Sequence, residues 1–286
     1  MKIASIIHTY LQPVDISLVV NTLKSQTLPA DTTHEIIVVE NGLPISQQAN
    51  FPGVTFLTSE KYIGMSQGLN LGIKQALQSE VDFVWLTDPF IVPMPDMLTQ
   101  FLQAVNTYKD CLAFTPKIYT DNSIKIISSA GYVTDWTNLT FSPRGLGEAD
   151  QQVFDRDLEV DYAPLNQLFI KSKAWSEVGL FDNRYFADFT AINLYTKIRA
   201  KGYRINLISL AHAIQASGKI TWPADADTYY SLRDKIFYSL NYAPVMTKLT
   251  DLKLALDKYL HGDTWEKKAV KDVFSANLGV GSYTWS

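Results

Sequence analysis

Short apolar runs alternate with segments of helical spacing from residue 2 to residue 88 of the chain. The runs KIASIIHTY, HEIIVVEN, GVTFLTSE and VDFVWLTD have the length and the β-branched residues of buried strands. Between them, DISLVVNTLKSQ carries apolar residues at helical spacing, and GMSQGLNLGIKQALQS opens with glycine and continues as a helix. This alternation predicts an α/β fold with a mostly parallel central sheet flanked by helices.

Polar side chains stand at the points where three of these runs end. Parallel strands end at the same edge of their sheet, and that edge is where such sheets bind ligands. We therefore expect these side chains to lie together in a binding site. The candidate binding residues are His8, Thr9, Tyr10, Glu40, Asn41 and Asp88.

The pattern changes after about residue 116. KIISSAGYVTDW and LTFSPRGLGEAD predict shorter, partly antiparallel strands, and AINLYTKIRAKG predicts a helix that ends at Gly202. In the helical tail, Leu249, Leu252, Leu256 and Leu260 form a stripe that we expect to pack on the core or on a partner rather than on a membrane. We divide the chain into a domain of residues 1–245, with halves 1–116 and 117–245, and a helical extension, 246–286.

Composition narrows the classes of function. Hydrophobic residues make up 47% of the 286 residues, which is typical of a globular chain, and 29 acidic residues against 25 basic ones argue against a nucleic-acid partner. Cys111 is the one cysteine, so no intrachain disulfide forms, which fits a reducing compartment. The N-terminal run predicts a strand rather than a signal peptide, and no apolar run reaches the roughly 18 residues of a membrane helix. A cytoplasmic location is expected, with peripheral association with a membrane left open.

Several motifs occur together in one order along the chain. They are IIVVENG, EKYIGMSQGLNLGI, SAGYVTD followed by RGLGEADQQVFD, LFIKSKAWSEVGLFDNRYF and YYSLRDKIFY. In this order they resemble the inverting family 2 glycosyltransferases of the GT-A fold, in particular the rhamnosyltransferase-like branch. The resemblance covers roughly residues 1–245.

The resemblance implies a nucleotide-sugar donor, linked to UDP or dTDP, and a saccharide or glycoconjugate acceptor in the assembly of surface glycans. The acidic residue before Asn-Gly, Glu40, would contact the base together with the first loop. Gly64, Gly68 and Asn70 match the glycine-spaced loop and join the candidate nucleotide-binding residues. A homodimer or a partner glycosyltransferase is also compatible with the family.

The sequence departs from the family at three chemical positions. Phe90 stands where the last metal-binding aspartate is expected, which leaves Asp88 as a single carboxylate and a poor site for Mg²⁺ or Mn²⁺. The expected acidic loop reads FTAIN, with Ala191 at the position of the base, and Gln215 replaces a histidine of the metal site. Asp188 is the nearby carboxylate that remains as a candidate catalytic base.

Three hypotheses follow from these departures. The first is an active inverting glycosyltransferase that uses Asp88 for the donor and Asp188 as base. The second is a catalytically inactive homologue that serves as a binding or accessory subunit. The third is an unrelated protein built on a similar sheet, a Rossmann-type oxidoreductase or a nucleotidyltransferase. The oxidoreductase is disfavoured because no Gly-x-Gly-x-x-Gly follows the first strand.

Overall fold

The computed structural model describes residues 1–43, 50–121, 125–186, 189–216, 218 and 222–285. Its N-terminal half follows the predicted alternation of strands and helices. The strands are β1 (Lys2–Tyr10), β2 (Thr33–Asn41), β3 (Thr55–Ser59), β4 (Phe83–Thr87) and β5 (Ile91–Pro93). The helices are α1 (Ser17–Lys24), α2 (Met65–Gln78) and α3 (Met97–Thr107). Strand β1 pairs in parallel with β2 and β4, and β2 pairs in parallel with β3, as predicted.

The rest of the chain contains strands of very different length and most of the helical residues. Its strands are β6 (Cys111–Asp121), β7 (Ile126–Ser129), β8 (Tyr132–Asp135), β9 (Thr140–Pro143), β10 (Leu158–Glu159), β11 (Gln167–Lys171) and β12 (Arg204–Gln215). Its helices are η2 (Gln152–Phe154, a 3₁₀ turn), α4 (Lys173–Val178), α5 (Phe189–Ala200), α6 (Ala224–Tyr242), α7 (Val245–His261) and α8 (Thr264–Phe274).

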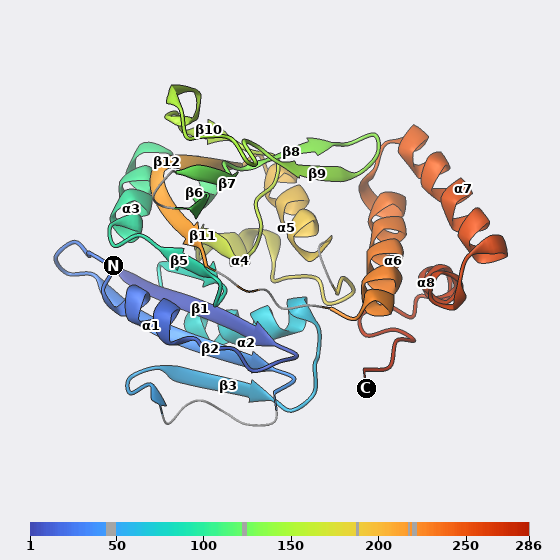
Figure 1. Cartoon of the computed structure of the whole chain (residues 1–286), viewed down its shortest axis with the longest axis horizontal. Coiled ribbons are helices and arrows are strands. Elements are labelled where there is room, and N and C mark those ends of the chain that lie inside the picture. The colour runs from blue at the N-terminus through green and yellow to red at the C-terminus, as the bar shows by residue number, and fades with distance from the viewer. Residues whose placement is uncertain (44–49, 122–124, 187–188, 217, 219–221, 286) are drawn as a thin grey trace.

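Both halves contribute to one central sheet, whose strand order is β10-β12-β6-β11-β4-β1-β2-β3 (Figure 1). Strand β11 runs antiparallel to both of its neighbours, β4 and β6, and β12 runs parallel to β6. The sheet therefore joins the parallel N-terminal strands to the second half through one reversed strand. The hairpin β8-β9 forms a separate small sheet.

The two faces of the sheet are covered by different helices. Along β1, Ala4 and Ile6 belong to the core packed under α2, α4 and α5, whereas Ile3 and Ile7 belong to the core packed under α1 and α3. Successive side chains of a strand point to opposite faces, so a strand that is apolar at nearly every position is buried on both sides. This double burial confirms the interpretation of KIASIIHTY as a central strand.

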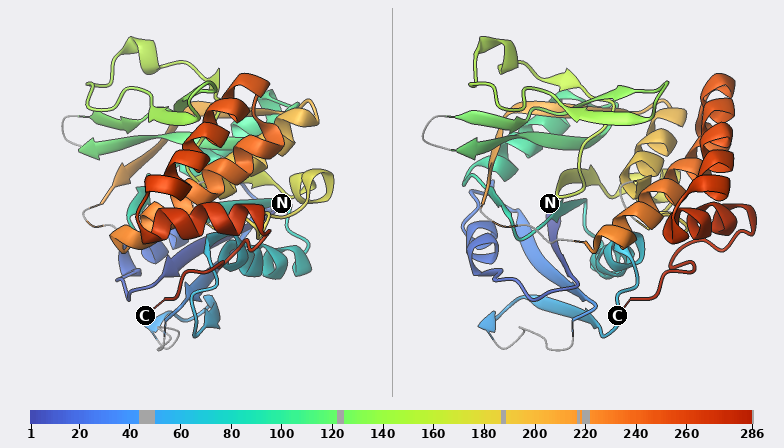
Figure 2. Two further views of the ribbon diagram at one scale, coloured as in Figure 1. Left: turned by 90° about the vertical axis from the view of Figure 1, so that its right-hand side faces the viewer. Right: turned by 45° about the vertical axis from the view of Figure 1, so that its right-hand side comes forward.

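The C-terminal helices pack beside the sheet rather than on it. Helix α6 lies between the rest of the molecule and the pair α7 and α8 (Figures 1 and 2). Helix α8 begins with a capping box, in which Asp263 accepts hydrogen bonds from the backbone N–H of Trp265 and Glu266, and Glu266 accepts from the backbone N–H of Asp263. Beyond α8 the chain returns across α6, where the Tyr230 hydroxyl donates to the carbonyl of Val280 at 2.9 Å.

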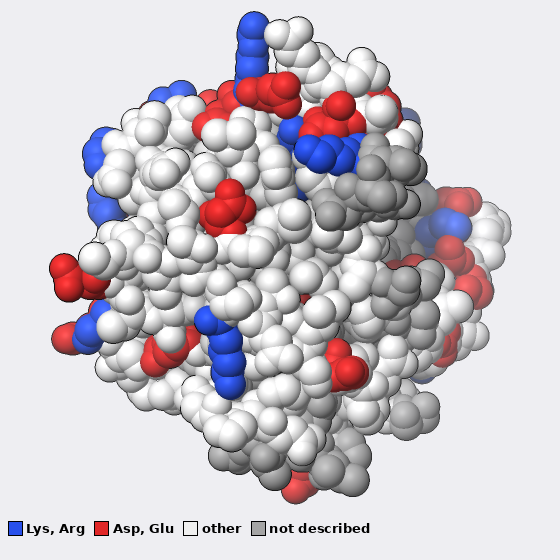
Figure 3. Space-filling model, turned by 60° about the vertical axis from the view of Figure 1, so that its left-hand side comes forward, with Lys and Arg blue, Asp and Glu red and all other residues white. Residues whose placement is uncertain are grey.

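Charged side chains are scattered over the face shown in Figure 3, with acidic and basic residues interspersed among neutral ones. This distribution agrees with the small net charge of −4. Among the residues that the structure describes, no helix has the length and apolar character needed to span a bilayer.

Candidate functional site

The ends of β1, β2 and β4 meet at one edge of the sheet. Tyr10 is in register with Asn41, Thr9 with Glu40, and Ile7 with Thr87. The structure therefore brings together the polar strand ends that the sequence pattern selected.

His8 and Asn41 form the buried floor of this edge. The side-chain nitrogen of Asn41 lies 3.1 Å from Nε2 of His8 and donates to the carbonyl of Gly64 at 2.9 Å. The backbone N–H of Ile63 donates to the Asn41 side-chain oxygen at 3.0 Å. Because the Asn41 nitrogen can only donate, His8 Nε2 accepts and the ring is neutral. Burial of this ring lowers the pKa of His8 to about 3.

The glycines of the loop before α2 make room for side chains of this floor. A Cβ on Gly68 would lie 2.4 Å from Nε2 of His8 and 2.5 Å from the Asn41 side-chain nitrogen. Gly64 has a φ of +91°, and a Cβ there would lie 2.5 Å from the ring of Phe186. Both positions thus require glycine for packing within the chain, whatever further role they have toward a ligand.

Three further candidate residues make hydrogen bonds within the chain: Thr9, Glu40 and Asn70. Thr9 and Glu40 are fully buried; Thr9 donates to the carbonyl of Val39 at 3.3 Å, and Glu40 accepts from the Thr58 hydroxyl at 3.1 Å. Asn70 on α2 donates to the carbonyl of Phe181 at 2.9 Å and accepts from its N–H at 3.1 Å. Asn70 therefore fastens α2 to the segment that leads into α5, a role that motif matching did not reveal.

Asp88 follows the last residue of β4 and is partly buried. Its Oδ1 accepts a hydrogen bond from the backbone N–H of Phe90 at 2.7 Å. Burial nevertheless raises the pKa of Asp88 to about 6, with the hydrogen bonds opposing this rise. A carboxyl group in this state changes charge just below neutral pH.

The hydrogen-bond partners of Asp88 among the described residues are Phe90, Ile91 and Asn166, and none of these is a carboxylate. Phe90 accepts a backbone hydrogen bond from Ala216 at 2.7 Å, and a Cβ on Gly218 would lie 2.6 Å from its ring. Gln215 accepts from the Ser128 hydroxyl at 2.8 Å. No group of three or more histidine, cysteine or acidic side chains that could hold a metal occurs in the described part of the chain. The donor set here does not fit Mg²⁺ or Mn²⁺, which bind several oxygen ligands.

His212 lies in a separate buried polar cluster. Its Nε2 is 2.7 Å from the carbonyl oxygen of Ser209, and its ring meets the edge of the Tyr119 ring at 5.3 Å. In the same cluster, Nζ of the buried Lys117 pairs with Asp150 at 2.9 Å, and burial lowers the pKa of His212. This location agrees with a packed histidine rather than with a replacement for the histidine missing at Gln215.

The segment FTAIN was expected to be an acidic-type loop running into the helix AINLYTKIRAKG, and the structure places all of it in the helix α5, whose first turn begins at Phe189. Thr190, Ala191 and Asn193 are 1%, 2% and 1% exposed, so none of them faces solvent. Phe189 anchors the turn, because its ring packs against those of Phe141 and Tyr238 at 6.1 and 5.4 Å. Asp188, the candidate base, lies outside the described residues.

Buried polar atoms remain at the start of α5. The hydroxyl of Thr190 and both side-chain polar atoms of Asn193 have no hydrogen-bond partner among the residues that the structure describes. Such groups are costly when buried, and they occur where the family places its acidic motif. Neither side chain can take a proton from an acceptor at neutral pH.

An aromatic cluster, which sequence reasoning missed, covers the outer side of the strand ends. Tyr10 packs on Tyr62 at 5.8 Å and meets the edge of Trp222 at 6.4 Å. From the C-terminal tail, Trp285 packs on Tyr62 at 4.8 Å and on Phe186 at 5.8 Å. Trp285 thus caps this side of the strand ends from within the chain.

Comparisons with known proteins bear on the fold of the chain. No family model matches the sequence, and no curated protein matches it. Among solved structures, the chain is similar to GalNAc-T7 with UDP, GalNAc and Mn²⁺, with a TM-score of 0.67 and 12% identity over 95% of this chain and 54% of that chain. It thus spans about half the length of that glycosyltransferase chain.

A second similar structure is TarS 1–349 from S. aureus in complex with UDP-GlcNAc. It aligns with a TM-score of 0.58 and 16% identity over 96% of this chain and 80% of that chain. Sequence identities of 12% and 16% establish only that these proteins share a fold with this chain. The chain has the GT-A glycosyltransferase fold, with a mixed α/β arrangement around a central, mostly parallel sheet.

Proposed function

We propose that this chain binds a nucleotide-sugar donor, linked to UDP or dTDP, at the edge formed by β1, β2 and β4. In this proposal it transfers the sugar with inversion to a saccharide or glycoconjugate acceptor. The observation that carries the proposal is the convergence of Tyr10, Asn41 and Asp88 at the carboxyl ends of three neighbouring strands of a GT-A fold. The similar structures named above contain UDP or UDP-GlcNAc, which supports the class of donor.

Binding in this site relies on the chain's own groups. Tyr10 stacks on the rings of His8 and Tyr62 and remains partly exposed at the strand ends, where its exposed part can contact a base. Above its pKa of about 6, Asp88 is a carboxylate that can accept a hydrogen bond from a ribose hydroxyl. Because the residues around Asp88 do not fit a divalent cation, the proposed binding does not involve one, and its affinity is correspondingly low.

Transfer with inversion needs a base on the face of the sugar opposite the leaving diphosphate. Asp188 is the residue proposed for that role, since Thr190, Ala191 and Asn193 cannot accept the proton. The general base removes the hydroxyl proton of the acceptor as its oxygen forms the new bond to the anomeric carbon. The nucleoside diphosphate leaves with the bonding electrons.

The test is nucleotide release from UDP- and dTDP-sugars in the presence of acceptor glycans. Wild-type protein is expected to release nucleotide slowly, and Asp188→Asn is expected to reduce that rate at least about 100-fold. Asp96→Asn is the matched control, because Asp96 is exposed at the start of α3 and away from the strand ends. Equal rates for Asp188→Asn and wild type would remove Asp188 from the chemistry.

A second candidate function is binding without transfer, as an accessory subunit. One observation favours it: Ala191 is buried inside α5 at the position where the family has its base. This alternative predicts nucleotide binding with no sugar-dependent release of nucleotide by the wild-type protein under any acceptor condition.

A further inference from the structure

Helix α7 carries large apolar residues on its outer side and small or polar residues on its inner side. The residues that face the protein are Thr247, Asp251 and Ala255. The large apolar residues are exposed instead: Val245 by 71%, Met246 by 73%, Leu249 by 49%, Leu252 by 37%, Leu256 by 59%, Tyr259 by 53% and Leu260 by 55%. The leucine stripe predicted from the sequence is therefore present, but it does not pack on the core of its own chain.

Polar contacts on the inner side hold α7 in this orientation. Asp251, which is 3% exposed, lies 3.8 Å from the ammonium group of Lys235 on α6. The Thr247 hydroxyl donates to the backbone carbonyl of Trp136 at 3.4 Å. The outward position of the leucines thus follows from contacts that a rotated helix would lose.

The spacing of the exposed residues is that of a helix-pairing seam. Val245, Leu249, Leu252, Leu256 and Tyr259 follow one another at intervals of four, three, four and three residues, the heptad pattern of two packed helices. Met246 and Leu260 widen the seam to a sector of roughly 140° at 100° per residue, the width of a helix face that packs in a protein core.

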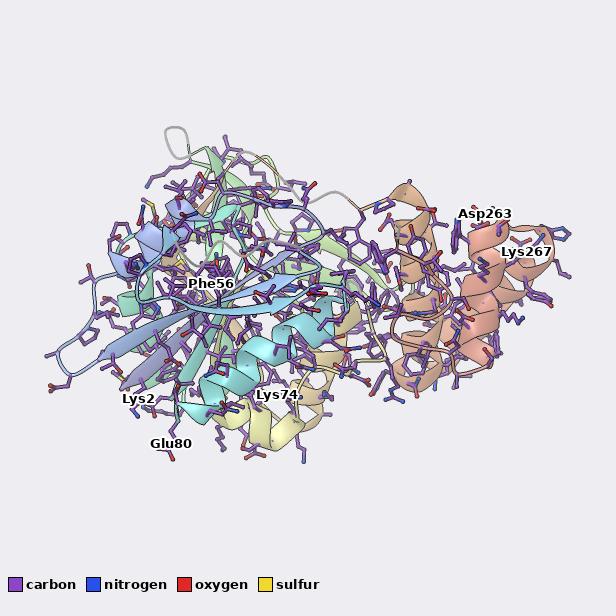
Figure 4. The ribbon with its side chains drawn as sticks, turned by 90° about the horizontal axis from the view of Figure 1, so that it is seen from below. Lys2, Phe56, Lys74, Glu80, Asp263 and Lys267 are labelled. Atoms are coloured by element: carbon purple, nitrogen blue, oxygen red, sulfur yellow. The ribbon has the colours of Figure 1, made fainter. Side chains whose placement is uncertain are left out.

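Helix α8 extends the same apolar surface. A groove of about 470 Å³ lies between the two helices, and Leu252, Leu256 and Tyr259 line it from α7. Phe274, which is 60% exposed, lines it from α8. Figure 4 shows Asp263 and Lys267 of α8 at the opposite end of the molecule from Lys2 and Glu80, so this surface is remote from the N-terminal strands.

We propose that the exposed face of α7, with Phe274 of α8, is the contact through which two copies of this chain form a dimer. The apolar side chains of this face leave roughly 300–400 Å² open to water in each copy. Burying both faces gives roughly 600–800 Å² of apolar area, which with a polar rim reaches the lower end of specific dimer interfaces.

The charges around the seam fit a protein partner better than a lipid surface. Residues 245–274 contain six lysines and five acidic residues, so the two helices carry almost no net charge. Lys258 and Glu266 also neutralise each other in an ion pair at 2.7 Å. Stable attachment to an anionic membrane relies on a cluster of cationic residues, which this mixture does not supply.

Sedimentation velocity of the full chain between 1 and 100 µM tests the proposal. Wild-type protein is expected to shift from the monomer mass of 32.2 kDa toward twice that mass as its concentration rises. Leu256→Glu places a charge in the seam and is expected to keep the protein monomeric at 100 µM. Leu210→Glu is the matched control, because Leu210 on β12 is 62% exposed and lies outside the seam, so this variant should still dimerise.

Circular dichroism will establish that each variant is folded, which is expected because both leucines are mainly exposed. A wild-type protein that stays monomeric at 100 µM overturns the proposal, and so does equal weakening of the dimer by Leu256→Glu and Leu210→Glu. Monomeric wild-type protein that cosediments with phosphatidylserine vesicles, and loses this binding in Leu256→Glu, also overturns it and assigns the face to a membrane.

Discussion

Replacing Asn41 by alanine is the sharpest test of how the strand-end site is built. Asn41 is fully buried, and its side chain bonds three groups from two segments: Nε2 of His8, the carbonyl of Gly64 and the N–H of Ile63. These contacts fasten the loop before α2 to the ends of β1 and β2. Asn41→Ala removes them together and adds no new contact.

The expected loss of stability follows from the groups left behind. A buried polar group that loses its partner costs about 1–3 kcal/mol. Part of this cost is recovered if water enters the space, so we expect the three orphaned groups to lower the free energy of unfolding by about 3–5 kcal/mol in total. Nucleotide binding should weaken as well, because the loop that carries Gly64 loses its attachment.

Urea denaturation followed by circular dichroism measures this loss. With a slope of about 3 kcal/mol per molar urea, the midpoint of Asn41→Ala should fall by about 1 M or more. Asn21→Ala on α1 is the matched control, since Asn21 is exposed, and it should change the free energy of unfolding by less than about 0.5 kcal/mol. A loss below about 1 kcal/mol for Asn41→Ala would refute the described hydrogen bonds as the fastening of this loop.

Three further predictions concern the same edge. Gly64→Ala should lower the free energy of unfolding by about 2–4 kcal/mol in the urea assay, because of the positive φ and the Phe186 ring, and an unchanged midpoint would contradict this. The raised pKa of Asp88 means that folded protein binds a proton more tightly than unfolded protein. As pH rises from 4 through 6, the free energy of unfolding of the wild-type protein should therefore fall by about 1–3 kcal/mol relative to that of Asp88→Asn. A difference between the two proteins that does not change with pH would argue against a raised pKa. His8 gives stability the opposite dependence on pH, because burial lowers its pKa in the folded protein to about 3. As pH falls from 6.5 to 5, the free energy of unfolding of the wild-type protein should fall by roughly 2 kcal/mol relative to that of His8→Gln. If the difference between the two proteins stays constant, His8 is not held neutral.

Local patterns were sufficient to predict the parallel strands and the meeting of their polar ends. The apolar runs near Ile6 and Val38 are long enough and branched enough to be buried strands, and parallel pairing then brings their polar ends to one edge. The closeness of His8 to Asn41 follows from that constraint, whereas the strand order β4-β1-β2 is set by the topology and was not predicted.

Long-range packing explains what the sequence did not predict. Helix α5 begins at Phe189, before the helix predicted from Ala191, and at Phe189 it packs against rings of β9 and α6, contacts that no local pattern contains. The aromatic cluster likewise joins Tyr62 to Trp285 across most of the chain. The exposure of the apolar face of α7 could not be predicted either, because a leucine at helical spacing, such as Leu256, is typical of a residue that packs in the core.

Calorimetric titration with UDP and dTDP, each with and without manganese, tests directly whether the strand-end site binds a nucleotide. We expect at least one nucleotide to bind with a dissociation constant of about 0.1–1 mM, unchanged by manganese because the described hydrogen-bond partners of Asp88 include no carboxylate. Tyr10→Ala should weaken this binding, whereas Tyr242→Ala, at an exposed position on α6, should not. Tight binding that depends on manganese, or no binding of either nucleotide at 10 mM, would contradict the proposed metal-independent binding at the strand ends.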